Sequence, residues 1–330
     1  MELFTNGIGL SAVVFFPLIS AFVITLIPKA QEQLIKRFAL ASSLITFVLS
    51  AILLFQFDFS SAEKLQLGNK ISWIKSINAN YEIGIDGISL PLLVLSTFIT
   101  VLAIIYSLEH LPEPKSPKGF LALILVLETG MNGTFVALDL ILFFVFFEIV
   151  LLPMYFMIGI WGDKTVRTVS GFKNQIETRL YASIKFFVFT LFGSAFMLLG
   201  FLGLYYRGNK TFSIPELIEL GTSGAFTGTF ATLVFAVLFL GFAVKVPMWP
   251  LHTWLPDAHT AAPTVGSVLL AAILLKLGSY GFVRIAIPIL PEQAKAWAPA
   301  IAILSAIGII YGSLACLAQT DLKRLIAFSS

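Results

Sequence analysis

The sequence predicts an all-α protein that crosses a membrane many times, and three observations support this prediction. Of its 330 residues, 58% are hydrophobic and only 12% are charged, and the mean hydropathy is +0.94. Nine stretches are long and apolar enough to span a bilayer, which takes about 20 residues. Two prolines follow a lysine at the end of one of these stretches, which predicts a broken helix near Lys245–Pro250.

The nine stretches cover residues 8–27, 38–57, 88–108, 119–138, 140–161, 182–206, 229–249, 264–287 and 298–318. A tenth helix is expected to begin near Leu322. The fourth and fifth stretches form one apolar block, and we place the turn between them at Leu138–Asp139. Asp139 is then the predicted N-cap of the fifth helix, because a carboxylate accepts hydrogen bonds from the free N–H groups of the first turn.

The distribution of Lys and Arg between alternate loops predicts the topology. The loops after odd-numbered stretches hold eleven: Lys29, Lys36, Arg37, Lys115, Lys118, Lys164, Arg167, Lys173, Arg179, Lys323 and Arg324. The loops after even-numbered stretches hold seven: Lys64, Lys70, Lys75, Arg207, Lys210, Arg284 and Lys295. Because positive loops stay in the cytoplasm, we expect an integral, multi-pass membrane protein with its N-terminus outside.

The overall charge and the cysteine count exclude other classes of function. The net charge of +3 is spread over loops, so no basic face for nucleic acid is expected. Cys316 is the only cysteine, which rules out an intrachain disulfide and any cysteine-ligated zinc or iron-sulfur site in this chain. His252 and His259 are metal-ligand types, but no third ligand accompanies them, so no metal site is predicted.

Five charged residues lie inside apolar stretches: Glu128, Glu148, Lys185, Lys245 and Lys276. A central Lys or Asp costs roughly 2.5–3.5 kcal/mol on insertion scales, so five such groups cost on the order of 10 kcal/mol. Packing alone does not offset a free-energy cost of this size, so the five charged residues indicate a role in moving ions. Lys185 lies near the start of its stretch, where a long side chain can reach the interface, and it is the weaker candidate.

The setting of Lys245 is different, because Pro247 and Pro250 each remove a backbone donor beside it. Carbonyls freed at membrane depth are tolerated only inside protein or in a wet cavity. A broken helix with a lysine at the break is typical of a transport site. Four further side chains follow the break: His252, Trp254, Asp257 and His259. Trp254 is expected to serve as an interfacial anchor, as the other tryptophans near segment ends do.

The placement of these residues suggests that Glu148 pairs with Lys245 and that the pair controls the proton affinity of Lys276 through water. The alternative is that each charge is a static tie between helices. For Glu128 both interpretations stay open, since the neighbouring Gly130 and Gly133 allow close helix approach.

Three parts of the sequence together resemble a known family. Residues 250–281 begin with PLHTWLPDAHTAAPTVGS, residues 137–162 contain ALDL and FE, and residues 319–330 read QTDLKRLIAFSS. These segments resemble the antiporter-like subunit M (chain 4) of proton-pumping NADH:quinone oxidoreductase, respiratory complex I. The resemblance covers most of the chain, and the run at 250–281 is the most specific part.

The resemblance implies a proton channel with a relay formed by Glu148, Lys245 and Lys276, with His252, His259 and Glu128 as secondary candidates. It also implies an inverted-repeat fold: helices 1–3 in residues 1–118, the first repeat in 119–287, and the start of an incomplete second repeat in 288–330. The sequence is therefore expected to be truncated relative to the family.

In that family, electron transfer takes place in partner subunits, so FMN, iron-sulfur clusters and quinone are expected there and no cofactor in this chain. The expected partners are the other membrane subunits, the lipid bilayer and protons, in a bacterial cytoplasmic membrane. Related sodium/proton antiporter subunits and membrane hydrogenase subunits remain alternatives, as does a non-conducting scaffold. Sodium-dependent transport without NADH or quinone would distinguish the antiporter.

Overall fold

The computed structural model describes residues 7–167 and 175–330. Lys173, one of the loop lysines counted above, lies outside the described residues. The chain forms two compact units, Met1–Met154 with Thr211–Ser213, and Tyr155–Lys210 with Ile214–Ser330. Within the described residues, nine helices are long and apolar enough to cross a membrane, which confirms the prediction of a multi-spanning helical protein.

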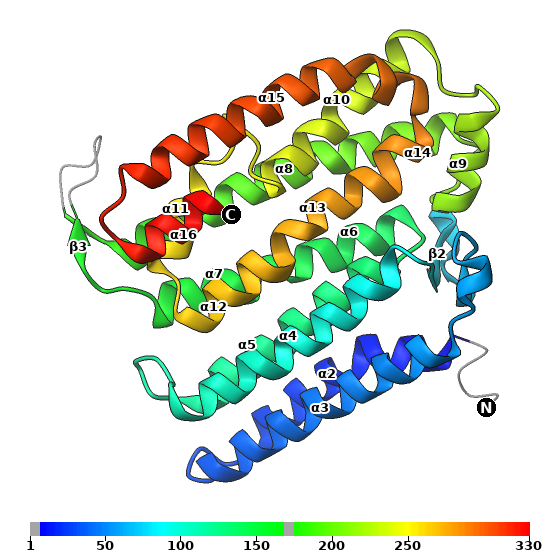
Figure 1. The fold of residues 1–330 in the computed structure, drawn as a ribbon. Coiled ribbons are helices and arrows are strands. Elements are labelled where there is room, and N and C mark those ends of the chain that lie inside the picture. Colours follow the sequence, from blue (N-terminus) through cyan, green and yellow to red (C-terminus); the bar gives the residue numbers. More distant parts are fainter. Residues whose placement is uncertain (1–6, 168–174) are drawn as a thin grey trace. The chain divides into compact units, whose positions relative to one another are not determined.

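The first unit is a bundle of helices that lie side by side (Figure 1). Its helices are α2 (Ile8–Leu26), α3 (Glu32–Gln56), α4 (Ser89–Glu109), α5 (Pro117–Val136) and α6 (Leu140–Ile149), and α7 (Leu151–Trp161) runs on into the second unit. Small polar side chains join the helices. The hydroxyls of Ser50 and Thr97 share a hydrogen bond of 2.7 Å, and Ser96 Oγ donates to Asn132 Oδ1 at 2.8 Å. Such bonds satisfy hydroxyls that lipid and apolar core cannot.

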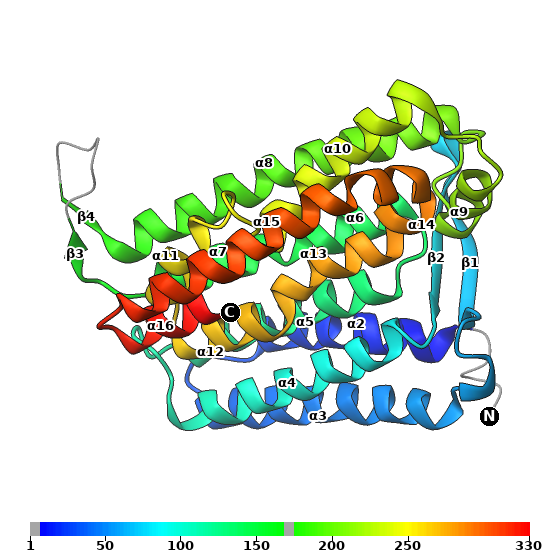
Figure 2. The same ribbon diagram turned by 45° about the horizontal axis from the view of Figure 1, so that its top comes forward.

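A β-hairpin joins α3 to α4, and the sequence did not predict it. Strands β1 (Gln66–Ile74) and β2 (Ala79–Ile85) pair in antiparallel orientation, and the hairpin lies at the end of the bundle where α3 ends and α4 begins (Figure 2). Short 3-10 turns, Phe59–Ser61 and Lys75–Ile77, flank β1.

The predicted turn at Leu138–Asp139 is confirmed, and Asp139 caps α6. Its carboxylate accepts from the backbone N–H groups of Ile141 at 2.9 Å and Leu142 at 3.2 Å. It also accepts from the backbone N–H of Asn80 at 2.9 Å. The side chain is fully buried, so burial raises the pKa of Asp139, while the three backbone donors act in the opposite direction. One carboxylate therefore both starts α6 and fixes the hairpin to it.

The second unit contains α8 (Thr178–Arg207), α9 (Ile214–Thr222), α10 (Gly228–Lys245), α11 (Trp254–Ala261), α15 (Pro291–Leu317) and α16 (Leu322–Ser329). A continuous helix between them, Thr264–Ile289, comprises α12 (Thr264–Leu269), α13 (Leu275–Gly281) and α14 (Ile287–Ile289) with two π-helical segments. Two-residue strands β3 (Val166–Arg167) and β4 (Ile176–Glu177) pair before α8. The predicted tenth helix is α16.

Helices α8 and α10 pack closely because each presents glycine to the other. A Cβ built on Gly241 would lie 2.7 Å from Cβ of Met197 and 2.9 Å from the carbonyl oxygen of Gly193. Ordinary van der Waals contact between carbon atoms needs about 3.5–4.0 Å. The contact lies one helical turn before Lys245, so the glycine sets how near the end of α10 comes to α8.

Candidate functional site

Helix α10 ends at Lys245, which confirms the predicted break beside that lysine. Sequence reasoning placed the end of this stretch at residue 249, but regular helix stops before Pro247. Lys245 is 3% exposed, so its ammonium group lies inside the protein. Burying an ionisable group at the end of a membrane helix costs free energy, and this cost alone makes Lys245 a functional candidate.

The backbone around the break shows where the last carbonyls of α10 find donors. Val246 N–H donates to Phe242 O at 2.8 Å, as in a regular helix. Pro247 has no N–H, and Met248 N–H reaches back to Ala243 O at 2.9 Å. In a continuing helix Met248 would have donated to Val244 instead.

The carbonyl of Val244 is satisfied by a side chain, because the indole Nε1 of Trp254 donates to it at 2.9 Å. Trp254 is 1% exposed, so the expectation that it is an interfacial anchor was wrong. Its indole N–H is used inside the protein, at the break. Sequence reasoning missed this role because nothing local indicates which carbonyl a tryptophan ten residues away will reach.

Lys185 also differs from its expected role as a lysine that reaches the interface. Its Nζ lies 2.8 Å from Oδ2 of Asp257 on α11, and both side chains are largely buried. The next residue of α8, Phe186, packs its ring against Trp254 with centroids 5.4 Å apart. Two adjacent residues of α8 therefore hold two residues of α11 that lie three apart, on one face of that short helix.

Lys276 lies at the second residue of α13, directly after the π-helical segment Leu270–Leu274. Its ammonium group donates to the carbonyl of Ala271 in that segment. The side chain is exposed in this chain, whereas the sequence suggested a buried group. The residue is central in its helix as predicted, but its side chain is on a face that the described residues leave open.

The helix of Lys276 approaches the end of α10 closely, because Gly278 lies at the contact. A Cβ built on Gly278 would lie 3.0 Å from Cβ of Lys245, 2.8 Å from a methyl of Val246 and 3.0 Å from the carbonyl of Phe242. The structure therefore brings together the two helices that carry Lys245 and Lys276.

Glu148 is the penultimate residue of α6 and is partly buried. The predicted stretch 140–161 is divided here into α6 and α7, with Val150 between them. Pro153 explains the interruption, because it cannot donate to the carbonyl of Ile149. Glu148 belongs to the first unit and Lys245 to the second, so their pairing stays a prediction.

Glu128 is fully buried on α5, and neither of its carboxyl oxygens has a hydrogen-bond partner among the described residues. The expected close approach of helices at its glycines is present, since a Cβ on Gly130 would lie 2.6 Å from a methyl of Val150. The carboxyl group itself makes no tie between helices within the part of the chain that the structure describes.

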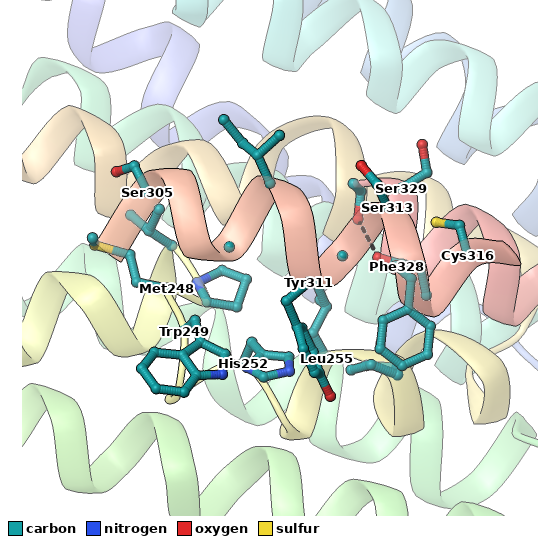
Figure 3. Close-up of a pocket in the computed structure, with 18 of the residues that line it drawn as sticks. Met248, Trp249, His252, Leu255, Ser305, Tyr311, Ser313, Cys316, Phe328 and Ser329 are labelled. Atoms are coloured by element: carbon teal, nitrogen blue, oxygen red, sulfur yellow. Dashed lines mark hydrogen bonds between the residues drawn. The ribbon is translucent and has the colours of Figure 1, made fainter. Parts of the chain in front are cut away.

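The two histidines after the break differ in their surroundings. The ring of His252 meets that of Tyr311 edge to face, with centroids 5.1 Å apart (Figure 3). Both line a pocket of about 580 Å³ between the break, α15 and α16. His259, by contrast, is 3% exposed and its Nε2 has no hydrogen-bond partner among residues 7–167 and 175–330. Burial, with the positive charges of Lys323 and Lys276, lowers the pKa of His259 to about 4.

Among the described residues, no group of three His, Cys, Asp or Glu side chains is placed to hold a metal ion. The second unit instead brings together Lys245, Lys276 and His259, with the Lys185–Asp257 ion pair beside them. Titratable groups beside a broken membrane helix are the features of a protein that moves ions through a membrane domain.

Residues 137–330 match the family described as NADH:quinone oxidoreductase/Mrp antiporter, TM, and residues 13–134 match NADH-ubiquinone oxidoreductase chain 4, amino terminus. The chain therefore belongs to the membrane-spanning NADH:quinone oxidoreductase/Mrp antiporter family. The resemblance read from the three sequence segments is confirmed.

Individual relatives agree with this assignment. The NADH-quinone oxidoreductase subunit M of Rickettsia bellii is 41% identical over 97% of this chain and 62% of its own length. The NADH-ubiquinone oxidoreductase chain 4 of Arabidopsis thaliana is 41% identical over 98% of this chain and 61% of its own length. The solved structure of respiratory complex I from Thermus thermophilus contains a chain with a TM-score of 0.80 at 26% identity, over 97% of this chain and 62% of that chain. The chain thus spans about 62% of the length of these relatives.

Proposed function

We propose that this chain conducts protons across the membrane as a subunit of an NADH:quinone oxidoreductase, driven by electron transfer in other subunits. One observation supports the proposal above the rest: each relay candidate lies at a departure from regular α-helix. Glu148 precedes the junction of α6 and α7, Lys245 ends α10, and Lys276 follows a π-helical segment.

Such departures matter because irregular backbone at membrane depth is tolerated only inside protein or along water. A π-helical turn within an α-helix is itself frequent at functional sites. A charged side chain beside either feature has access to partners that a lipid-facing residue lacks. The close approach at Gly278 places the helix that carries Lys276 directly beside the end of α10, where Lys245 lies.

Within this proposal, Glu148 pairs with Lys245, and opening the pair changes the proton affinity of Lys276. His252, His259 and Glu128 are secondary candidates, and Glu128 adds a buried carboxyl group without a hydrogen-bond partner in the described residues. The repeat boundaries 1–118, 119–287 and 288–330 belong to the same proposal.

FMN, iron-sulfur clusters and quinone are proposed for partner subunits, in line with a chain whose only cysteine is Cys316. The proposed partners are the neighbouring membrane subunits of the oxidoreductase, and the proposed location is the bacterial cytoplasmic membrane with the N-terminus outside.

A sodium/proton antiporter subunit is the second candidate, because the family description also includes the Mrp antiporter. Sodium supplied to sealed vesicles distinguishes the two. An antiporter subunit moves protons in response to a sodium gradient without NADH or quinone, whereas the proposed subunit needs NADH oxidation.

Replacing Glu148 by Gln in the intact complex tests the proposal, since the substitution keeps size and removes charge. NADH-driven proton translocation and NADH:quinone turnover are measured together in sealed vesicles. Proton translocation should fall by about tenfold or more, and the number of protons moved per NADH oxidised should fall with it, because one relay position can no longer exchange a proton. Glu219→Gln is the matched control, because Glu219 is exposed on α9 and outside the site. Unchanged pumping by an assembled Glu148→Gln complex would show that Glu148 is only structural.

A further inference from the structure

A side-chain hydrogen bond helps to hold the end of α10. Pro247 has no N–H, and Met248 N–H donates to the Ala243 carbonyl. The Val244 carbonyl accepts a hydrogen bond from the Trp254 indole N–H at 2.9 Å. Val244 and Trp254 are each 1% exposed, so this hydrogen bond is shielded from outside water. The residue after Val244 is Lys245, so whatever fixes the Val244 carbonyl also fixes the backbone from which the Lys245 side chain extends.

The position of Trp254 is in turn fixed by α8. The Phe186 and Trp254 rings pack 5.4 Å apart, and one residue earlier the Lys185 ammonium meets the Asp257 carboxylate at 2.8 Å. Helix α11 has only eight residues. A helix this short is marginal without outside support, so its orientation depends on contacts like these.

We propose that the Lys185–Asp257 ion pair acts as a positioning device for Lys245, by holding α11 so that Trp254 bonds the Val244 carbonyl. Lys185, Asp257 and Trp254 are positioning residues, which act through the backbone of Lys245. The inference rests on the proposed function, because it assigns Lys245 to the relay.

The contacts form a series that begins at the Lys185–Asp257 ion pair, passes through α11 and Trp254, and ends at the backbone of Lys245. If the ion pair is removed, α11 can turn about its own axis, because its charged anchor is lost while the aromatic contact remains. The indole N–H then moves away from the Val244 carbonyl, and the last turn of α10 loosens. Electron transfer in other subunits does not depend on this turn, whereas proton delivery through Lys245 does.

The test uses the intact complex in sealed vesicles and compares the number of protons translocated per NADH oxidised. Lys185→Met and Asp257→Asn should each lower this ratio by about threefold or more. The exchanged pair, Lys185→Asp with Asp257→Lys, should restore at least half of the loss. Recovery on exchange separates an electrostatic anchor from two unrelated structural residues.

Trp254→Phe tests the second link, since it keeps an aromatic ring against Phe186 and removes the N–H donor together with part of the indole ring. The ratio should fall as it does for Asp257→Asn. Trp297→Phe is the control, because Trp297 packs its ring on Phe235 and Phe239 away from the break. If Lys185→Met fails to assemble, Trp254→Phe and the exchanged pair still decide the outcome.

Two results would overturn the inference: a normal ratio for Trp254→Phe in an assembled complex, or an exchanged pair no better than the single variants. The Glu148→Gln complex is measured in parallel. If Glu148→Gln stops pumping while Lys185, Asp257 and Trp254 variants pump normally, the positioning device is wrong and the proposed function stands. If Glu148→Gln pumps normally, the proposed function itself fails.

Discussion

Replacing Gly278 by Ala should separate the two lysine-bearing helices. The new Cβ would lie 2.8 Å from the Val246 methyl and 3.0 Å from both the Phe242 carbonyl and the Lys245 Cβ. Reaching ordinary carbon–carbon contact of about 3.5 Å requires a displacement of roughly 0.5–0.7 Å. Two of the three neighbours are a backbone oxygen and a Cβ, which cannot swing aside as the end of a long side chain can.

The expected cost has two parts of opposite sign. Overpacking a close contact costs about 1–3 kcal/mol, while Ala in place of Gly in a helix interior contributes up to about 1 kcal/mol of stability. Gly308→Ala on α15 is the matched control, because a Cβ there meets nothing within 4 Å. The difference between the two variants therefore isolates the overpacking, about 1–3 kcal/mol of destabilisation.

The functional consequence should be larger than the stability change. A displacement of 1 Å at a reacting site can cost about a hundredfold in rate, so roughly half an ångström corresponds to about tenfold. Proton uptake by sealed vesicles, measured with a pH-sensitive dye beside NADH oxidation, should fall by that factor for Gly278→Ala and stay unchanged for Gly308→Ala. Equal pumping by both variants in fully assembled complexes would refute the argument that proton transfer depends on the spacing of the two helices that carry Lys245 and Lys276.

Two further predictions concern stability. Asp139→Ala removes the acceptor of three backbone N–H groups at a fully buried N-cap, and should destabilise the subunit by about 2–4 kcal/mol in a thermal unfolding assay. Asp321→Ala is the control, because Asp321 is the exposed N-cap of α16. Equal losses of stability in the two variants would contradict the prediction. Because the pKa of His259 is lowered from 6.5 to about 4, the buried neutral ring contributes stability above pH 6.5 that is lost as the pH falls toward 4, up to about 3 kcal/mol. His259→Gln in detergent should therefore flatten the decline of unfolding temperature between pH 6.5 and 4, and an unaltered decline would show that another group causes it.

The positions of the membrane helices could be predicted because hydropathy is a property of a continuous stretch. The break at Lys245 could be predicted for a similar reason, since the missing donor of Pro247 acts on its own helix. The N-cap role of Asp139 was also local, because the carboxylate bonds to N–H groups two and three residues later.

Interactions between distant residues could not be predicted in this way. Lys185 lies 72 positions from Asp257, and a lysine near a helix end fits the interface equally well until its partner is known. The β1–β2 hairpin was missed because its strands are stabilised by pairing with each other and by the contact of Asn80 with Asp139, which no hydrophobic pattern records. Lys276 was placed correctly in the chain, but its exposed face depends on which helices surround α13.

The three relay candidates also differ in how their irregular backbone arises. Prolines cause two of the irregularities, at Pro153 and Pro247, whereas the π-helical segment before Lys276 contains neither proline nor glycine and gave no signal in the sequence. At the α10 break, the carbonyls of Phe242, Ala243 and Val244 all have donors from the protein itself. Water that enters beside this break is therefore not needed to satisfy these three carbonyls. Because their donors are groups of the protein, these carbonyls hold the backbone of Lys245 in a fixed position, which is what the proposed relay requires of it.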